Sequence, residues 1–359
     1  MPKPIIEKTV SEHVLTVGEY YKDRVHGGIA SVLKYYEPYY EPYQFIPSSR
    51  GRSIGDKLAY DLFSLFRLGW KLLWNPRIRV VHIHTASGRS FPRHLLHVFV
   101  AKLLRRKVIL HCHAARFHIW YGSLSPKRQQ RVLGAVLRVD RLIVLSQSWK
   151  EYYGSLGIPA DKIVVLNNIT PDPECAVRPR KPEEALQLFF LGEIGERKGV
   201  FDVLAAMKDL PEKNLVHFDI GGNKREEDLL NKINELGLSD NVTFHGFVGG
   251  EQKKALLESA HVFILPSWNE GLPIAILEAM SYGCAIISTP VGGIPEVVKD
   301  NGILVQPGNV KQIADAIVQM LDEPQRHRMG EKSLELVKPF YPQAVLTHLR
   351  SVYSELLDE

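Results

Sequence analysis

The chain has few cysteines, no long hydrophobic run and no hydrophobic start. Only three cysteines occur among 359 residues, and their spacing matches neither a disulfide framework nor a metal site: Cys112, Cys175 and Cys284. No run of 18 or more apolar residues exists, so no helix is expected to span a membrane. The segment that begins at Met1 lacks the apolar core of a secretory signal. These absences predict a cytoplasmic protein with reduced thiols.

Acidic residues are scarce in the amino half. Residues 1–170 carry 26 lysines and arginines against 11 aspartates and glutamates, a net charge of +15, whereas residues 171–359 carry 19 against 29, a net charge of −10. A basic half indicates an anionic partner. Nucleic acid fits poorly, because no helix-turn-helix, zinc-finger or aromatic RNA-binding signature is present. An anionic membrane surface or a lipid diphosphate fits better, and we expect no nucleic-acid partner.

The remaining composition is that of a globular protein with two domains. Apolar residues make up 45% of the chain and charged residues 24%, and 359 residues exceed the usual size of one domain. Apolar runs alternate with helical stretches in both halves, which predicts parallel α/β sheets. The predicted strands are 14–17, 80–83, 108–110, 142–145, 163–166, 188–191, 216–220, 242–244, 262–265, 285–288 and 303–305. We place domains at 1–167 and 185–340, a proline-rich, charged linker at 168–184, and a last helix within 341–359.

The stretch from Pro266 to Val297 carries the clearest chemical pattern. Pro273 is expected at the first position of a helix, where its missing N–H is not needed. Gly283 is expected to end that helix. N–H groups at Gly271 and Leu272, together with the helix dipole, favour a phosphate at the helix start.

Two glutamates flank this helix start. Glu270 precedes the helix, and Glu278 lies about 8 Å along it from Pro273, at 1.5 Å per residue. This pair is too wide for a retaining glycosidase, whose carboxyl groups lie roughly 5–5.5 Å apart. It suits an elongated ligand with a diphosphate in the middle and a polyol at each end. For an isolated pair, an ordinary helix start with one solvated and one hydrogen-bonded glutamate is the alternative.

The order of residues around this pair resembles the donor-site signature of a known family. N-E-G-L-P-x-x-x-x-E-A-M-x-x-G, which contains Glu270 and Glu278, is followed by V-G-G-I-P-E. Together they are similar to retaining glycosyltransferase family 4, within the group 1 glycosyltransferases. The resemblance implies the GT-B fold, an α/β architecture of two Rossmann-like, doubly wound parallel-sheet domains that face a central cleft. It also implies that the helix within 341–359 crosses back to the first domain.

The resemblance further implies roles for individual residues. Arg197 and Lys198 would stabilise charge on a leaving diphosphate, while Glu270 and His113 would bind the transferred sugar, and these four form the implied catalytic set. Glu278 would hold the ribose hydroxyls. The other implied contacts with the donor are Gly27, Gly28, Phe247, Val248, Gly271, Leu272 and Pro273.

One position departs from the family pattern. Glu193 stands where the family usually has an arginine, and Arg197 would supply the missing cation.

Two features bear on metal binding. No D-x-D occurs at a strand end, which agrees with a transferase that binds no metal. His82 and His84 share a strand face and could hint at a metal, but no third ligand is apparent, and hydrogen-bonded core histidines are the favoured interpretation.

The helix expected at about 56–74 combines an apolar face with cations and indoles. Arg67, Trp70, Lys71 and Trp74 lie near its end, and basic amphipathic helices that contain tryptophan can lie on anionic lipid. A solvated charged face is the alternative. Membrane contact would make the protein peripheral on the inner face of the plasma membrane.

The combined prediction is an enzyme, a retaining and metal-independent hexosyltransferase without a cofactor. It would move a hexose from a UDP- or GDP-sugar to a hydroxyl of a saccharide or lipid-linked saccharide, in surface polysaccharide or glycolipid assembly. The nucleobase stays open because the backbone is expected to read it, and the sequence does not specify the acceptor. The alternatives are a nucleotide-sugar epimerase or phosphorylase on the same fold, a non-catalytic sugar-binding protein, or a nucleic-acid-binding module on the basic half.

Overall fold

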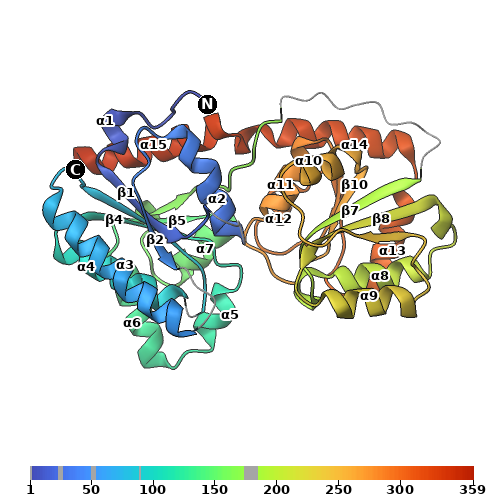
Figure 1. Ribbon diagram of the computed structural model, residues 1–359, viewed down its shortest axis with the longest axis horizontal. Coiled ribbons are helices and arrows are strands. Elements are labelled where there is room, and N and C mark those ends of the chain that lie inside the picture. Colours follow the sequence, from blue (N-terminus) through green and yellow to red (C-terminus); the bar gives the residue numbers. More distant parts are fainter. Residues whose placement is uncertain (1, 23–26, 50–53, 89, 174–184) are drawn as a thin grey trace. The chain divides into compact units, whose positions relative to one another are not determined.

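The computed structural model describes residues 2–22, 27–49, 54–88, 90–173 and 185–359, which form two compact units. Unit 1 consists of residues 1–169 and 340–359, and unit 2 of residues 170–339 (Figure 1). Most of the predicted linker, residues 174–184, lies outside the described residues. Among the described helices, none is long and apolar enough to cross a membrane.

Unit 1 is built on six parallel strands in the order β2-β1-β3-β4-β5-β6. The strands are β1 (Val14–Glu19), β2 (Phe45–Ser49), β3 (Val80–Thr85), β4 (Lys107–Cys112), β5 (Arg141–Val144) and β6 (Ile163–Val165). The helices are α1 (Lys8–Ser11), α2 (Gly28–Tyr36), α3 (Ile54–Trp74), α4 (Ser90–Leu103), α5 (Phe117–Gly122), α6 (Pro126–Val136), α7 (Gln147–Ser155) and α15 (Pro342–Asp358). All six residues of β3 are buried, as expected for a central parallel strand, and they include the polar residues His82, His84 and Thr85.

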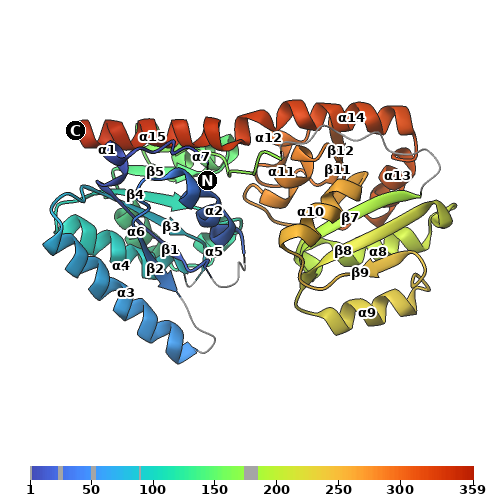
Figure 2. The ribbon, with the colours of Figure 1, turned by 45° about the horizontal axis from the view of Figure 1, so that its top comes forward.

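The carboxyl-terminal helix α15 belongs to unit 1. It contacts α1, α2 and β3, and Figure 2 shows it lying along this unit. The buried hydroxyl of Tyr353 lies 3.0 Å from the hydroxyl of Tyr40 and 2.6 Å from Nδ1 of His82. The last helix is therefore held to the first sheet by buried hydrogen bonds as well as by apolar packing.

Unit 2 repeats this plan with six parallel strands in the order β12-β11-β10-β7-β8-β9. The strands are β7 (Leu186–Glu193), β8 (Val216–Asn223), β9 (Val242–Phe244), β10 (Val262–Leu265), β11 (Ala285–Ser288) and β12 (Gly302–Leu304). The helices are α8 (Val200–Lys208), α9 (Glu226–Glu235), α10 (Gly250–Ser259), α11 (Ile274–Ser281), α12 (Ile294–Val297), α13 (Val310–Gln319) and α14 (Glu323–Leu336).

Each sheet reverses its direction of growth at one point. In unit 2, β8 and β9 extend the sheet on one side of β7, whereas β10, β11 and β12 extend it on the other. In unit 1 the reversal falls between β1 and β3. Doubly wound sheets bind ligands beyond the carboxyl ends of the strands at such a switch point. The loops after β7 and β10 are therefore the first place to look for a ligand site in unit 2.

Three short elements of unit 1 were not predicted from the sequence: β2, α1 and α5. Strand β2 contains Pro47, which argues against a strand because proline lacks the N–H that a central position needs. The structure places β2 at the edge of its sheet, where proline is tolerated. Helices α1 and α5 have four and six residues, too few to show a helical hydrophobic period.

Candidate functional site

The loops after β7 and β10 bring a lysine and a glutamate into direct contact. Lys198 ends the short 3-10 helix Glu196–Lys198, and its Nζ lies 2.5 Å from Oε1 of Glu270, which follows β10. Both side chains are largely buried, with exposed fractions of 15% and 7%. Arg197 Nη1 lies 4.0 Å from the same glutamate oxygen. The switch point of unit 2 therefore holds a buried carboxylate with two cations beside it.

Two glycines let the loops around this pair approach closely. A Cβ on Gly199 would lie 2.3 Å from the carbonyl oxygen of Pro266, and a Cβ on Gly292 would lie 2.1 Å from that of Glu270. Both glycines have positive φ, 74° and 56°, which other residues rarely adopt. A larger residue at Gly199 would push the loop that carries Lys198 away from the segment after β10, and one at Gly292 would push the loop after β11 away from Glu270.

Helix α11 begins one residue later than predicted and ends as predicted. Pro273 is the extended residue before the helix, with φ −73° and ψ 121°, and Ile274 is the first helical residue. The prediction was wrong because the fixed φ of proline fits both an extended and a helical residue. At the other end Gly283 has φ 71°, and the N–H of Cys284 donates to the carbonyl of Ala279. This is the Schellman pattern that a glycine stop favours.

Glu278 lies on α11 and is buried, with 5% exposure. Its Oε1 lies 2.6 Å from Nζ of Lys253, which belongs to α10. A carboxylate accepts several hydrogen bonds at once, so a lysine neighbour is compatible with hydroxyl ligands. Sequence reasoning missed Lys253, because no motif marks it and only the packed structure brings it to Glu278.

Glu193, the departure from the family pattern, takes part in a chain of charges. Its Oε2 lies 3.0 Å from Nζ of Lys224 and 3.9 Å from Nη2 of Arg197. Arg197 therefore stands between Glu193 on one side and Glu270 on the other. In addition, its Nη1 donates to the carbonyl of Asn269 at 3.4 Å. The acidic residue at this position thus helps to hold the arginine beside the Lys198–Glu270 pair.

The end of β8 and the loop after β9 lie against each other at the same end of the sheet. A Cβ on Gly221 would lie 2.9 Å from Cγ2 of Val248, and a Cβ on Gly222 would lie 2.2 Å from the carbonyl oxygen of Gly192. Val248 is buried, whereas Phe247 is 51% exposed. The segment predicted to read a nucleobase therefore packs on the two glycines near the end of β8.

The predicted site residues of unit 1 follow β1 and β4. Gly27 is the residue before α2, with φ 97°, and Gly28 begins that helix. His113 follows β4, and its Nε2 lies 2.9 Å from Nδ1 of His84. Burial lowers the pKa of His113 to about 3, although a hydrogen bond with Asn168 acts in the opposite direction. The imidazole is therefore neutral at neutral pH.

Three other imidazoles gather around His113, and they correct one prediction from the sequence. The expectation that His82 and His84 lack a third neighbour was wrong, because the parallel register of β3 and β4 places His111 beside His84. Side-chain nitrogens of His82, His84 and His111 lie within 4.8 Å of one another, a donor set that could hold a divalent metal.

The same rings also form a hydrogen-bonded core cluster, as the sequence predicted. His82 Nε2 lies 3.3 Å from His111 Nδ1. Burial, followed by the other rings of the cluster, lowers the pKa of all three histidines. The Nε2 atoms of His84 and His111 have no hydrogen-bond partner within the described part of the chain.

Two family models match the chain, one on each half. The model described as "Glycosyl transferases group 1" matches residues 173–335, and the model described as "Glycosyl transferase 4-like domain" matches residues 18–168. The first match contains Lys198, Glu270 and Glu278, and the second contains Gly27, Gly28 and His113.

Similar proteins carry glycosyltransferase names. The putative colanic acid biosynthesis glycosyltransferase WcaL of Escherichia coli K12 is 29% identical over 222 residues, covering 58% of this chain and 55% of the relative. O-antigen chain mannosyltransferase B of Escherichia coli is 29% identical over 232 residues, 60% of each chain. The 2-deoxystreptamine N-acetyl-D-glucosaminyltransferase of Niallia circulans is 25% identical over 295 residues, 76% of this chain and 75% of the relative. The chain thus spans little more than half the length of several curated relatives that it matches.

Solved structures share the fold over nearly the whole chain. HepE of Anabaena, solved in complex with UDP-glucose, has a TM-score of 0.71 at 16% identity and covers 96% of this chain and 99% of its own. The lipopolysaccharide outer core galactosyltransferase WaaB has a TM-score of 0.68 at 16% identity, with coverages of 95% and 99%. At this identity the likeness shows the fold, which is GT-B.

Proposed function

Because the chain belongs to the group 1 glycosyltransferases, we propose that it transfers a hexose from a UDP- or GDP-sugar to an acceptor hydroxyl, with retention at the anomeric carbon. The observation that carries this proposal is the buried Lys198–Glu270 pair, with Nζ and Oε1 2.5 Å apart at the switch point of unit 2. A diphosphate needs clustered cations and main-chain N–H groups. Lys198, Arg197 and the start of α11 offer both kinds of group.

In this proposal each candidate residue of unit 2 binds one part of the donor. Arg197 and Lys198 bind the diphosphate, assisted by main chain at 271–273 before α11. Glu270 accepts hydrogen bonds from the sugar hydroxyls, and Glu278 accepts them from the ribose. The backbone at Phe247 and Val248 lies against the nucleobase, which leaves the choice between uracil and guanine to donor measurements.

The chemistry proposed for this site is electrostatic. Negative charge grows on the leaving diphosphate in the transition state, and fixed cations stabilise that charge more than they stabilise the bound donor. We assign no enzymatic nucleophile. The acceptor hydroxyl attacks on the face that the diphosphate leaves, and a phosphate oxygen takes the proton of this hydroxyl. Retention follows from that geometry, and no cofactor or metal takes part in the proposed step.

Three residues of unit 1 complete the proposal. Gly27 and Gly28 offer main chain at the start of α2, and His113 offers an imidazole to the transferred sugar. His84 and Asn168 hold this imidazole on the protein side. The ring therefore has a fixed orientation, and a sugar hydroxyl that bonds to it would replace one of these two partners, because a neutral imidazole has only two nitrogens.

The acceptor proposed is a saccharide, in the lipid-linked form that surface polysaccharide or glycolipid assembly uses. Relatives named for colanic acid, O-antigen chain and amylovoran synthesis support this choice. A lipid-linked acceptor would bring the protein to the inner face of the plasma membrane as a peripheral protein. The basic character of unit 1 supports that location, since anionic lipid attracts lysine and arginine.

Replacing Glu278 with glutamine tests the donor assignment. The change removes the charge but keeps the shape, and a hydrogen bond to a charged group contributes about 1.5–3 kcal/mol. We therefore expect kcat/KM for the donor to fall by about 10- to 100-fold, with most of the change in KM. Steady-state transfer with labelled UDP- and GDP-hexoses measures this effect.

The matched control is Glu258→Gln, on α10, where the carboxylate lies 3.9 Å from Lys254 and is partly exposed. This variant should keep the wild-type kinetics. Unchanged donor KM in a folded Glu278→Gln protein, at limiting donor, would refute the ribose assignment.

A further inference from the structure

Most of the large hydrophobic side chains that are exposed in the described part of the chain lie on one face of unit 1. Of the 17 large hydrophobic residues exposed in the described part of the chain, nine lie on α3 and α4. We call them the α3–α4 face: Leu62, Phe63, Phe66, Trp70, Leu73, Trp74, Leu96, Phe99 and Leu103. Exposed patches of this kind mark interaction sites in soluble proteins.

These exposed side chains lie on two helices that pack against each other, not on a frayed end of the chain. Helices α3 and α4 contact each other, and both views show them side by side (Figures 1 and 2). On the inner side of α3, Leu68 and Leu72 are completely buried, while Trp74 on the outer side is 70% exposed. A helix that is apolar on both sides needs a second apolar partner, because a single core covers only one of them.

The aromatic side chains on the outer side form a ladder along α3. Phe66 and Trp70 stack with ring centroids 6.1 Å apart, and Trp70 and Trp74 follow at 5.4 Å. Indole rings combine a large apolar body with one N–H donor, which is why they gather where a bilayer meets water.

Positive charge predominates along the part of the sequence that carries this face. No aspartate or glutamate occurs between Asp61 and Asp140, whereas 15 lysines and arginines do. Asp61 itself is neutralised by Arg93, with both carboxylate oxygens within 2.8 Å of Nη1. The partner of this face should therefore be apolar and anionic at once, and a lipid bilayer with acidic head groups has both properties.

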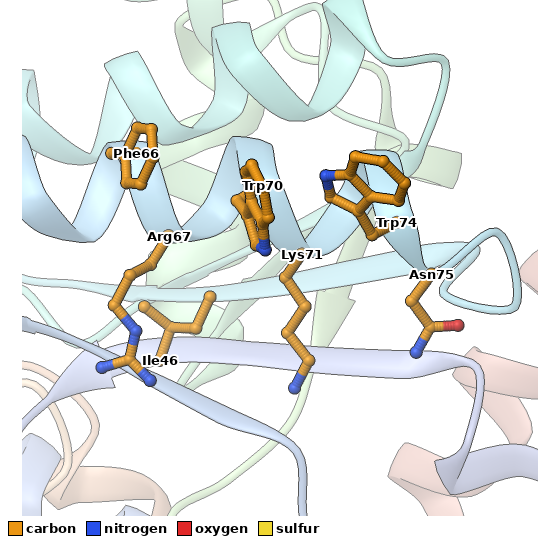
Figure 3. A pocket seen from close by; sticks show the side chains of 7 residues that line it. All are labelled: Ile46, Phe66, Arg67, Trp70, Lys71, Trp74 and Asn75. Atoms are coloured by element: carbon orange, nitrogen blue, oxygen red, sulfur yellow. The ribbon is translucent and has the colours of Figure 1, made fainter.

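A hollow at the edge of the face holds two of these cations. It has a volume of about 500 Å³ and is lined by Ile46, Phe66, Arg67, Trp70, Lys71, Trp74 and Asn75. Figure 3 shows Arg67 and Lys71 extending from α3 to the side on which Ile46 lies. They are four residues apart, a spacing at which like charges repel. Burial, and then Arg67, lowers the pKa of Lys71. Among the side chains that the structure describes, no carboxylate forms a salt bridge with either cation.

We propose that the α3–α4 face docks on an anionic membrane and that Arg67 and Lys71 bind the phosphate of a lipid head group in this hollow. Helix α3 then lies in the interface plane, with Trp70 and Trp74 at the level of the head groups. The proposal deepens the membrane contact within the proposed function and does not depend on the donor chemistry of unit 2. A second copy of the chain fits this face poorly, because two such faces would bring like charges together.

Vesicle co-sedimentation of the full chain tests the docking and the head-group site. Vesicles of phosphatidylcholine alone are compared with vesicles that contain about 30% phosphatidylglycerol, at about 50 mM and about 500 mM NaCl. We expect pelleting with the anionic vesicles at low salt. The Arg67→Gln/Lys71→Gln variant should bind them at least about tenfold more weakly, since each cation near the surface attracts anionic lipid.

Matched controls show whether binding depends on these particular cations and indoles or only on the total charge and apolar surface of the protein. Lys208→Gln/Lys213→Gln removes two exposed charges from unit 2, and Leu215→Ala/Leu230→Ala removes two exposed leucines there. Both should pellet like the wild type, whereas Trp70→Ala/Trp74→Ala should not pellet. The conservative Trp70→Phe/Trp74→Phe variant should still pellet but should lose most of the fluorescence quenching that brominated lipid causes in the wild type.

Three outcomes decide the proposal. Wild-type protein that stays in the supernatant with anionic vesicles overturns the docking. Equal binding of wild type and Arg67→Gln/Lys71→Gln overturns the head-group site. A dimer that dissociates on Trp70→Ala/Trp74→Ala, without lipid binding, assigns the face to a second copy instead. Transfer to a soluble acceptor should be unchanged in all these variants, so a failure here is distinct from a failure of the proposed reaction.

Discussion

Replacing Lys198 with alanine is expected to lower the rate of sugar transfer by about 100- to 1,000-fold. The lysine nitrogen lies 2.5 Å from Glu270, with Arg197 beside the same carboxylate. In the proposed reaction this charge stabilises the leaving diphosphate as it becomes more negative. Its loss should therefore reduce kcat more than it weakens binding of the donor.

Two further variants make this result specific. Lys198→Arg keeps the positive charge and should lose less activity than Lys198→Ala. Lys208→Ala, at the end of α8 on the surface of unit 2, should keep the wild-type rate. Thermal unfolding is measured alongside, because removing one partner of a buried ion pair also destabilises the fold. A folded Lys198→Ala protein with wild-type kcat at saturating donor would contradict the electrostatic role.

Acidification from about pH 7.5 to about pH 5 is expected to destabilise unit 1. Burial lowers the pKa of His82, His94 and His113 to about 3, whereas an unfolded histidine titrates near pH 6.5. Below about pH 6.5 the unfolded chain therefore binds protons that the folded unit excludes, and stability falls until the folded pKa is reached. At pH 5 a single histidine of this kind costs about 2 kcal/mol, which is a large share of the stability of a domain.

Tryptophan fluorescence during urea unfolding at several pH values measures this loss. Four of the five tryptophans lie in unit 1, so the signal reports mainly on that unit: Trp70, Trp74, Trp120 and Trp149. His94→Gln should reduce the dependence of stability on pH by up to one proton between about pH 6.5 and 3. His327→Gln replaces a histidine that is 58% exposed and should not change it. An unfolding midpoint that stays constant from pH 7.5 to 5 would contradict neutral buried histidines.

Local sequence signals predicted the helix and strands that carry the candidate donor site. Gly283 ends α11 as expected because the left-handed residue after a helix favours glycine, which has no Cβ. The apolar runs that became β10 and β11 are fully buried, the condition under which a parallel strand can be read directly from hydrophobicity. Helix α3 was also predicted within its observed bounds, since 21 residues give several turns of a regular apolar pattern.

Contacts between elements could not be predicted, because they depend on packing and strand register. The Lys198–Glu270 pair joins residues 72 positions apart, and the Lys253–Glu278 pair joins residues 25 apart. Neither spacing matches the period of a helix or a strand. The sequence therefore indicated residues that matter at the site but not which of them pair. The third histidine beside His82 and His84, His111, was likewise missed, since only the register of β3 and β4 places it next to His84.

Hydrogen–deuterium exchange of the full chain with and without saturating UDP or GDP tests the central claim most directly. The claim is that a nucleotide diphosphate binds at the switch point of unit 2, where the glycine-rich loop after β7 meets the stretch Pro266–Val297. The account predicts slower exchange in residues 192–199 and 266–297 with at least one of the two nucleotides, and less protection of these segments in Lys198→Ala at the same concentration. Unchanged exchange in both segments with either nucleotide, or protection confined to other parts of the chain, would contradict it.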